Sequence, residues 1–253
     1  MDIKIAVAAH KRYWMPDDDM YLPVAAGANV NACADYAPDN AGDNISDKNP
    51  HYCELTVLYW AWRNLNADYI GLAHYRRHFS WKGAGGPKFQ RVITREKLEG
   101  VLRKTDIVLP APRNYFIETN YGQYAHAHHA ADLDLTREIL SERFPNCLSA
   151  FDKSMARTGG HRFNMFVMRR DLLDMYCQWL FDVLFELERR LDISAYSPYD
   201  ARVFGFVGER LLDVWLETSR MPYAELPYVF LEKQNWLRKG GAFVLRKAGL
   251  RGL

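Results

Sequence analysis

Basic and imidazole side chains follow two apolar, strand-like segments of the sequence. His10 and Lys11 come directly after residues 3–9, and His74-Tyr75-Arg76-Arg77 comes directly after residues 68–73. Guanidinium groups stay charged and pair in two-pronged fashion with phosphate oxygens. An isolated pair of arginines is more often simply exposed on the surface, but ligands bind beyond the carboxyl ends of strands in open α/β sheets. The sequence therefore predicts a diphosphate site that includes His10, Lys11, His74, Arg76 and Arg77.

A polar loop ahead of a predicted helix extends this candidate site. Asn49-Pro50 marks a helix start, and residues 43–48 precede it. Backbone N–H groups at a helix N-terminus favour anions. Asp43, Asn44 and Lys48 are therefore added to the predicted donor-binding residues, with a solvated loop as the equally simple alternative.

The segment 126–134 is rich in histidine and aspartate. Imidazole and carboxylate groups are the ligands that zinc takes, so His126, His128 and Asp132 could serve a metal-dependent hydrolase. The spacing departs from known metal motifs, and Asp132 and Asp134 also suit the first turn of a helix. We expect a polar, substrate-facing loop that contributes His126, His128 and Asp134, and keep the hydrolase as an alternative function.

The elements that must position these residues alternate between strand and helix. Strands are predicted at residues 3–9, 68–73, 106–110 and 163–168, and helices begin near residues 49, 94, 134, 171 and 197. Residues 15–48 are predicted to be a long irregular stretch, because Pro, Gly, Asp and Asn recur through it. The alternation predicts an α/β fold with a Rossmann-type, mainly parallel sheet covered by helices.

Composition excludes several classes of protein. The chain has 253 residues and a net charge of 33 − 31 = +2, which is too balanced for a nucleic-acid binder held by phosphate charge. It contains no apolar run near the roughly 18 residues that span a bilayer. The four cysteines are scattered without a C-x-x-C, and charges interrupt the start of the chain where a signal peptide would be apolar. These features predict a cytoplasmic protein with reduced thiols.

The last residues differ in composition from the rest. From residue 233 onward there are six basic and no acidic side chains, interleaved with aromatic and aliphatic ones. Such a segment suits an anionic membrane surface, although a solvated extension explains it equally well. We expect one domain over residues 1–236 and a basic amphipathic tail over residues 237–253, with the inner face of the cell membrane as a candidate partner.

Seven ordered motifs resemble a known family over residues 3–236. They are Ala9-His10-Lys11, Gly42-Asp43-Asn44-Ile45-Ser46, Asn49-Pro50 with Cys53-Glu54-Leu55-Thr56, Gly71-Leu72-Ala73-His74-Tyr75-Arg76-Arg77, His126-Ala127-His128-His129, Arg162-Phe163-Asn164-Met165-Phe166-Val167-Met168, and Phe204-Gly205-Phe206 with Glu209-Arg210-Leu211-Leu212. This set resembles the bacterial capsular and exopolysaccharide glycosyltransferases of domain of unknown function 4422. The resemblance implies a single GT-A-like domain. It also implies transfer of a hexose, galactofuranose from UDP-galactofuranose, to a cell-surface polysaccharide or lipid-linked glycan.

The resemblance also implies roles for individual residues. GT-A enzymes usually carry Asp-x-Asp at a strand end to hold Mn²⁺ or Mg²⁺ on the diphosphate, whereas this chain has His74-Tyr75-Arg76 there. No metal ligand is therefore assigned, and cationic side chains are expected to neutralise the leaving group. Asn164 falls where related folds line the sugar pocket.

An inverting transfer needs a carboxylate that takes the proton of the acceptor hydroxyl. Glu209 is the first candidate, because its helical position between Phe206 and Leu212 predicts partial burial. Its partner would be Arg202, Arg210 or a substrate hydroxyl. Asp200, which also suits a Ser197-capped helix start, and Asp132 follow. A non-catalytic sugar-nucleotide-binding protein, suggested by 14% aromatic residues, is the remaining alternative.

Overall fold

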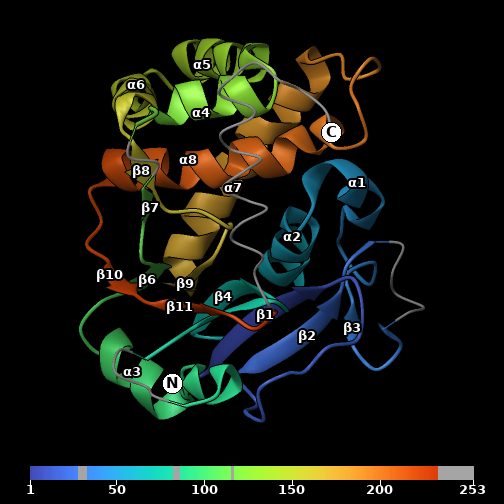
Figure 1. Cartoon of the computed structure of the whole chain (residues 1–253), viewed down its shortest axis with the longest axis vertical. Helices are drawn as coiled ribbons and strands as arrows, with labels where there is room; N and C mark the ends of the chain where they lie inside the picture. Colours follow the sequence, from blue (N-terminus) through green and yellow to red (C-terminus); the bar gives the residue numbers. More distant parts are fainter. Residues whose placement is uncertain (28–32, 82–85, 115–116, 233–253) are drawn as a thin grey trace.

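The computed structural model describes residues 1–27, 33–81, 86–114 and 117–232, and a mixed sheet lies at its centre (Figure 1). Seven strands follow one another across this sheet in the order β10-β6-β9-β4-β1-β2-β3, and β5 and β11 extend it beside β4. Their bounds are β1 Ile3–Ala9, β2 Tyr21–Ala25, β3 Ala37–Pro38, β4 Tyr69–His74, β5 Arg77–Phe79, β6 Ile107–Pro110, β9 Phe166–Arg169, β10 Ala224–Leu226 and β11 Tyr228–Phe230. A separate two-stranded antiparallel sheet pairs β7 (Arg113–Asn114) with β8 (Gly159–Gly160).

Four of the six pairings along this order of seven strands are parallel. β1 pairs in parallel with both β2 and β4, and β6 pairs in parallel with β10. β9 runs antiparallel between β4 and β6. Consequently the carboxyl ends of β1, β4 and β6 and the amino end of β9 meet at one edge. The predicted α/β fold with a mainly parallel sheet is confirmed.

Helices cover both faces of the sheet. One face carries α3 (Arg95–Leu102), and the remaining long helices lie on the other side (Figure 1). These are α2 (Leu55–Asn64), α4 (Asn120–Ala127), α5 (Ala130–Arg143), α6 (Leu148–Ala156), α7 (Arg170–Arg190) and α8 (Val203–Ser219), with the short α1 (Asn49–Tyr52) beside α2. Of these, α2 and α7 lie against the sheet, and α4, α5 and α6 are stacked above α8 (Figure 1). In the described ranges, no helix combines the length and the apolar character needed to cross a membrane.

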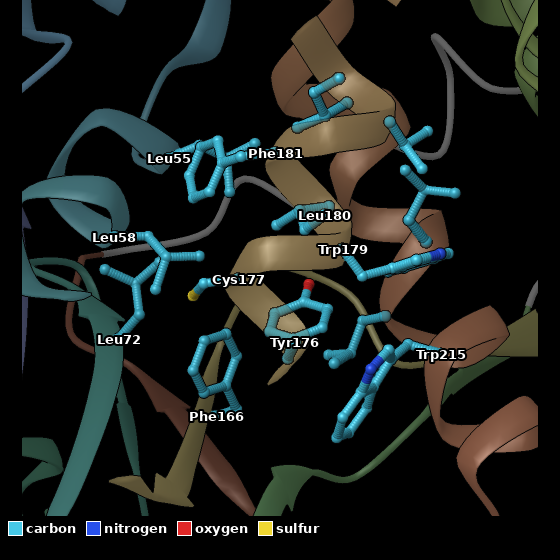
Figure 2. Close-up of a cluster of buried hydrophobic side chains, with 14 of the residues drawn as sticks. Leu55, Leu58, Leu72, Phe166, Tyr176, Cys177, Trp179, Leu180, Phe181 and Trp215 are labelled. Atoms are coloured by element: carbon cyan, nitrogen blue, oxygen red, sulfur yellow. The ribbon is translucent and has the colours of Figure 1, made fainter. Parts of the chain in front are cut away.

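The larger core is built around α7. Four side chains of α7, Tyr176, Cys177, Leu180 and Phe181, lie among residues of α2, β4 and β9 (Figure 2). Trp215 of α8 lies on the opposite side of α7. Tyr176 packs edge-on against Phe166 of β9, with ring centroids 5.5 Å apart. This packing holds α2 and α8 at fixed positions above the sheet, and both helices contribute to the site described below.

The prediction of an irregular stretch over residues 15–48 was wrong for β2, which pairs in parallel with β1. Turn residues dominate the stretch and Pro23 interrupts its pattern, so no strand was expected there. The connection that follows is organised by Asp39, which is fully buried. Its carboxylate accepts hydrogen bonds from the Gly27 N–H, the Ser46 hydroxyl and the Thr56 hydroxyl. A buried carboxylate with three donors ties the connection to the start of α2.

The helix predicted from Asn49 is divided in two. Cys53, between α1 and α2, has φ 54° and ψ −133°, a region that non-glycine residues rarely occupy. Such a conformation costs on the order of 1–3 kcal/mol and persists only where its surroundings enforce it. The break turns the chain so that Glu54, at the start of α2, lines a cavity.

Candidate functional site

A cavity of about 460 Å³ lies at the sheet edge where β1 and β4 end. The α1–α2 junction and the start of α8 complete its walls. Its lining consists of His10, Asn49, Pro50, Cys53, Glu54, His74, Arg76, Arg77, Arg202, Gly205, Phe206 and Glu209. Residues far apart in the sequence thus meet at the place where α/β sheets bind ligands.

Three guanidinium groups line this cavity. Arg76 follows β4, and its Nη1 lies 3.7 Å from the carboxylate of Glu232. The guanidinium of Arg77 stacks over the ring of Phe163, 4.1 Å from its centroid. Arg202 comes from the start of α8 and donates from Nε to the Cys53 sulfur at 3.1 Å. Three permanent positive charges in one cavity form a site for a multiply charged anion.

The two histidines of the cavity are neutral at physiological pH. Burial, together with the charges of Arg77 and Arg76, lowers the pKa of His74 to about 2. Burial also lowers the pKa of His10, helped by the charges of Arg202 and Arg76. The positive charge of the cavity therefore comes from its arginines, while the imidazoles offer neutral hydrogen-bonding groups.

Glu54 is the most strongly enclosed carboxylate of the site. Burial raises its pKa, and the negative charge of Glu209 raises it further. Its Oε1 accepts a hydrogen bond from Asn164 Nδ2 at 3.0 Å. Asn164 is itself buried, in a left-handed turn with φ 50° just before β9, and the same amide also donates to the Gly205 carbonyl at 3.2 Å. This arrangement fixes Glu54 between the start of β9 and the start of α8.

Glu209 presents the second carboxylate. It lies one turn after Phe206 on α8, and its side chain is 23% exposed. The nearest cation recorded in the described structure is Arg210, whose Nη1 is 3.9 Å from Glu209 Oε2, beyond hydrogen-bonding distance. The Arg210 guanidinium instead donates to the Phe206 carbonyl and to Gln123. Glu209 therefore offers the cavity a partly exposed carboxylate whose ion pair with Arg210 is longer than a hydrogen bond, and whose charge also attracts Arg77.

The donor set of this cavity does not fit a divalent metal. Mg²⁺ and Mn²⁺ need several oxygen ligands converging on one point. Within the part of the chain that the structure describes, no group of three or more His, Cys, Asp or Glu side chains is placed to hold a metal ion. Around the cavity the two glutamates face arginines, so no chemical step is assigned to a metal here.

Comparisons with known proteins agree with this architecture. Residues 4–220 match a family described as Domain of unknown function (DUF4422). The chain belongs to this family.

Its structure is also similar to that of WbbM, a bifunctional glycosyltransferase solved in its apo state, with a TM-score of 0.83 and 29% sequence identity. The similarity covers 92% of this chain and 46% of WbbM, so the chain spans about half the length of that protein. No curated protein matches the chain. The resemblance stated from the sequence is thereby confirmed at the level of family and fold.

In this member of the family, the cavity contains five of the predicted site residues, namely His10, His74, Arg76, Arg77 and Glu209. Lys11 lies nearby, and its Nζ is 3.0 Å from Glu232 Oε1, the same carboxylate group that Arg76 faces. Asn164 donates a hydrogen bond to Glu54, as described above. The strand-end clusters and the last helix are thus brought together as the sequence predicts.

The predicted residues of the loop before α1 lie elsewhere. Asp43 pairs with Arg63 at 2.6 Å. Asn44 donates to the carbonyls of the loop itself, and Lys48 Nζ lies 2.8 Å from Glu188 Oε1 on α7. Each of the three has a structural partner outside the cavity, whose lining takes Asn49 and Pro50 from this region instead.

The histidine-rich segment and its acidic neighbours are spread over several contacts. His126 is exposed and faces Glu118 at 3.0 Å, whereas His128 faces Asp200 at 3.3 Å. Asp132 is buried and accepts hydrogen bonds from Tyr124 and Tyr196, at 2.7 and 2.6 Å, and burial raises its pKa. The structure does not bring His126, His128 and Asp132 together as the hydrolase alternative requires.

The other two carboxylates of this region also have local partners. Asp134 accepts a hydrogen bond from Tyr121 at 2.9 Å. The Asp200 N–H donates to the Ser197 hydroxyl, which donates in turn to the Asp200 carboxylate at 2.7 Å. These two bonds form a local turn, but the predicted helix start capped by Ser197 was wrong: a short 3-10 helix begins at Asp200 and α8 begins at Val203, and neither has a side-chain cap.

Two charged residues of the cavity lining, Glu54 and Arg202, were not assigned to the site from the sequence. Glu54 belongs to one of the seven family motifs, but its approach to Glu209 depends on the break at Cys53, which no sequence pattern announces. Arg202 was considered only as a partner for Glu209. The spacing of Arg202 and Glu209, seven residues apart at the start of one helix, was the available signal that both face the same way.

The contact between α8 and the α1–α2 junction leads to a stability prediction. A Cβ on Gly205 would lie 3.1 Å from the Cβ and Sγ of Cys53 and 3.3 Å from the Tyr52 carbonyl. These neighbours are held by the strained turn and cannot retreat easily. We expect Gly205→Ala to lower the melting temperature, although alanine favours a helix over glycine by about 1 kcal/mol.

Gly100→Ala in α3 is the matched control, because nothing lies within 4 Å of its added Cβ. It should stabilise the chain by about 1 kcal/mol in chemical denaturation. Equal stabilisation by both substitutions would show that α8 does not press on Cys53.

Proposed function

We propose that this chain is a glycosyltransferase that moves a hexose from a nucleoside-diphosphate sugar to a glycan acceptor. The observation that carries the proposal is the cavity in which Arg76, Arg77 and Arg202 face two glutamates. A leaving diphosphate needs concentrated positive charge, and an attacking hydroxyl needs a base. The similarity to a bifunctional glycosyltransferase over 92% of the chain supports the same reaction class.

The proposed reaction is an inverting displacement. Glu209 accepts the proton of the acceptor hydroxyl as its oxygen attacks the anomeric carbon of the donor sugar. The bond from that carbon to the diphosphate oxygen breaks, and its electron pair leaves with the nucleoside diphosphate. The three arginines stabilise the negative charge that grows on this leaving group. Asp200 and Asp132, the other candidate bases, rank below Glu209. The Asp200 carboxylate already accepts a hydrogen bond from Ser197, and the Asp132 carboxylate accepts hydrogen bonds from two tyrosines.

The nucleoside is proposed to lie beside the end of β1. The rings of Tyr13 and Tyr75 are 5.4 Å apart there, and His10 lies 6.4 Å from Tyr75. Nucleobases stack on such aromatic side chains. UDP-galactofuranose, implied by the family resemblance, is the proposed donor, and a cell-surface polysaccharide or lipid-linked glycan is the proposed acceptor.

The proposed place of the reaction is the cytoplasmic face of the cell membrane. The composition of the tail, residues 237–253, suits an anionic membrane surface, and this segment lies outside the described residues. The boundary at residue 236 lies outside them as well, so both remain predictions.

A donor screen tests the proposed function. Purified protein is incubated with UDP-galactofuranose, UDP-galactose, UDP-glucose or UDP-N-acetylglucosamine and glycan acceptors, and released UDP and new glycosides are measured with Mn²⁺ or with EDTA. We expect one donor, UDP-galactofuranose, to yield UDP and a new glycoside at equal rates in EDTA and in Mn²⁺. Failure of every donor to react would contradict the transferase, and a reaction abolished by EDTA would contradict the role of the arginines.

A further inference from the structure

Three aromatic rings form a cluster beside the cavity. Tyr199, just before α8, is 53% exposed. Its ring lies 5.5 Å from the His128 ring at an interplanar angle of 24°, and His128 lies 4.2 Å from the Phe206 ring at 27°. The Tyr199 and Phe206 rings also contact each other, with centroids 5.4 Å apart at 49°, so the three rings form one cluster in which the His128 side chain is only 7% exposed. We call these three residues the aromatic platform.

The platform is continuous with the cavity. Phe206 belongs to both, and Glu209 follows it one turn later on α8. The Arg202 guanidinium lies 5.4 Å from the Phe206 ring and 5.9 Å from the Tyr199 ring. A molecule resting on Tyr199 would therefore extend past Phe206 towards Glu209.

Hydrogen-bonding groups border the platform. The Asp200 carboxylate lies 3.3 Å from His128 Nδ1 and 3.8 Å from His129 Nε2, and its side chain is 23% exposed. His129, 44% exposed, stacks on Tyr196 with centroids 4.1 Å apart. An exposed flat ring bordered by a carboxylate and an imidazole matches a sugar, whose C–H face is apolar and whose hydroxyls project from its edge.

We propose that the aromatic platform binds a sugar ring of the acceptor, with Tyr199 as the stacking surface and the hydroxyl to be modified directed towards Glu209. This inference rests on the proposed function for the identity of the ligand. The platform requires only that the acceptor carry a sugar ring with an apolar C–H face. It places no requirement on the rest of the acceptor. Tyr199 is prearranged by its neighbours, so stacking costs little conformational entropy.

Saturation-transfer NMR with methyl hexopyranosides, methyl galactofuranoside and β-linked disaccharides tests the platform without turnover. We expect at least one of these sugars to receive saturation on its C–H protons from the wild-type chain. Tyr199→Ala should weaken that binding roughly three- to tenfold, as loss of an aromatic contact does. Tyr199→Phe keeps the ring and should bind as the wild type does.

Tyr223→Ala is the matched control, because Tyr223 is also an exposed tyrosine, at 43%, but lines a different cavity. It should bind the same sugars unchanged. A wild type that binds no sugar in the set, or a Tyr199→Ala variant that binds them equally well, would overturn the platform.

Thermal shifts with UDP, recorded on the same samples, separate this inference from the proposed function. UDP stabilisation in both wild type and Tyr199→Ala, without Tyr199-dependent sugar binding, would remove the platform alone. Sugar binding that depends on Tyr199, without any response to UDP, would remove the transferase and leave the platform as a carbohydrate-binding surface.

Discussion

Glu209→Gln is expected to lower kcat for sugar transfer by about 10²–10⁴-fold, the usual contribution of a positioned general base. Glutamine keeps the size of the side chain but cannot accept a proton from the attacking hydroxyl. Because Glu209 is partly exposed and its ion pair with Arg210 spans 3.9 Å, the substitution should leave folding and UDP binding intact. Steady-state kinetics with saturating donor, together with a UDP thermal shift, measure both effects.

Glu217→Gln provides the matched control for this prediction. Glu217 lies on the same helix, but it forms a surface pair with Arg157 at 2.7 Å. Surface ion pairs contribute little, so this variant should transfer sugar at the wild-type rate.

Glu54→Gln distinguishes the two glutamates of the cavity. Glutamine retains an oxygen that can accept the Asn164 hydrogen bond, and the proposed reaction gives the proton to Glu209 and not to Glu54. This variant should therefore keep more activity than Glu209→Gln. If Glu54→Gln lost transfer and Glu209→Gln kept it, the assignment of the base would be wrong.

The sequence could predict the sheet edge because its signals were local. Residues 3–9 and 68–73 are apolar runs that end in charged clusters, and parallel strands place such ends side by side. His10, His74, Arg76 and Arg77 could therefore be assigned to one site from their positions in the sequence. The helical spacing of Phe206 and Glu209 gave similar information about α8.

Other parts depended on tertiary contacts that carry no local pattern. β2 contains Pro23 and lies among turn residues, yet pairing with β1 and the buried Asp39 hold it in the sheet. Lys48 and Asp43 were expected at the site from their place before a helix, but Glu188 and Arg63 bind them. The residues that pair with Lys48 and Asp43 are distant from them in the sequence, so composition and spacing could not identify these pairs.

Arg76→Ala and Arg202→Ala are each expected to weaken UDP binding by about 10- to 100-fold. Hydrogen bonds to charged groups contribute about 1.5–3 kcal/mol, and each guanidinium is proposed to face the diphosphate. Both residues are partly exposed to the cavity, so their loss should not unfold the chain. Arg137→Ala is the matched control, because this arginine pairs with Asp152 on the surface.

Uridine separates contacts to the diphosphate from contacts to the nucleoside. Since uridine carries no phosphate, Arg76→Ala and Arg202→Ala should bind it as the wild type does. If a variant bound uridine and UDP more weakly by the same factor, the substitution would have distorted the cavity in general rather than removed a phosphate contact.

Isothermal titration of UDP and uridine in EDTA, into the wild type and these arginine variants, shows whether the arginines hold a diphosphate without a metal. We expect the wild type to bind UDP more tightly than uridine under these conditions, and each cavity arginine to contribute to this difference while Arg137 does not. Equal affinity of the wild type for UDP and uridine, or a preference for UDP that survives both cavity substitutions, would contradict the proposed diphosphate site.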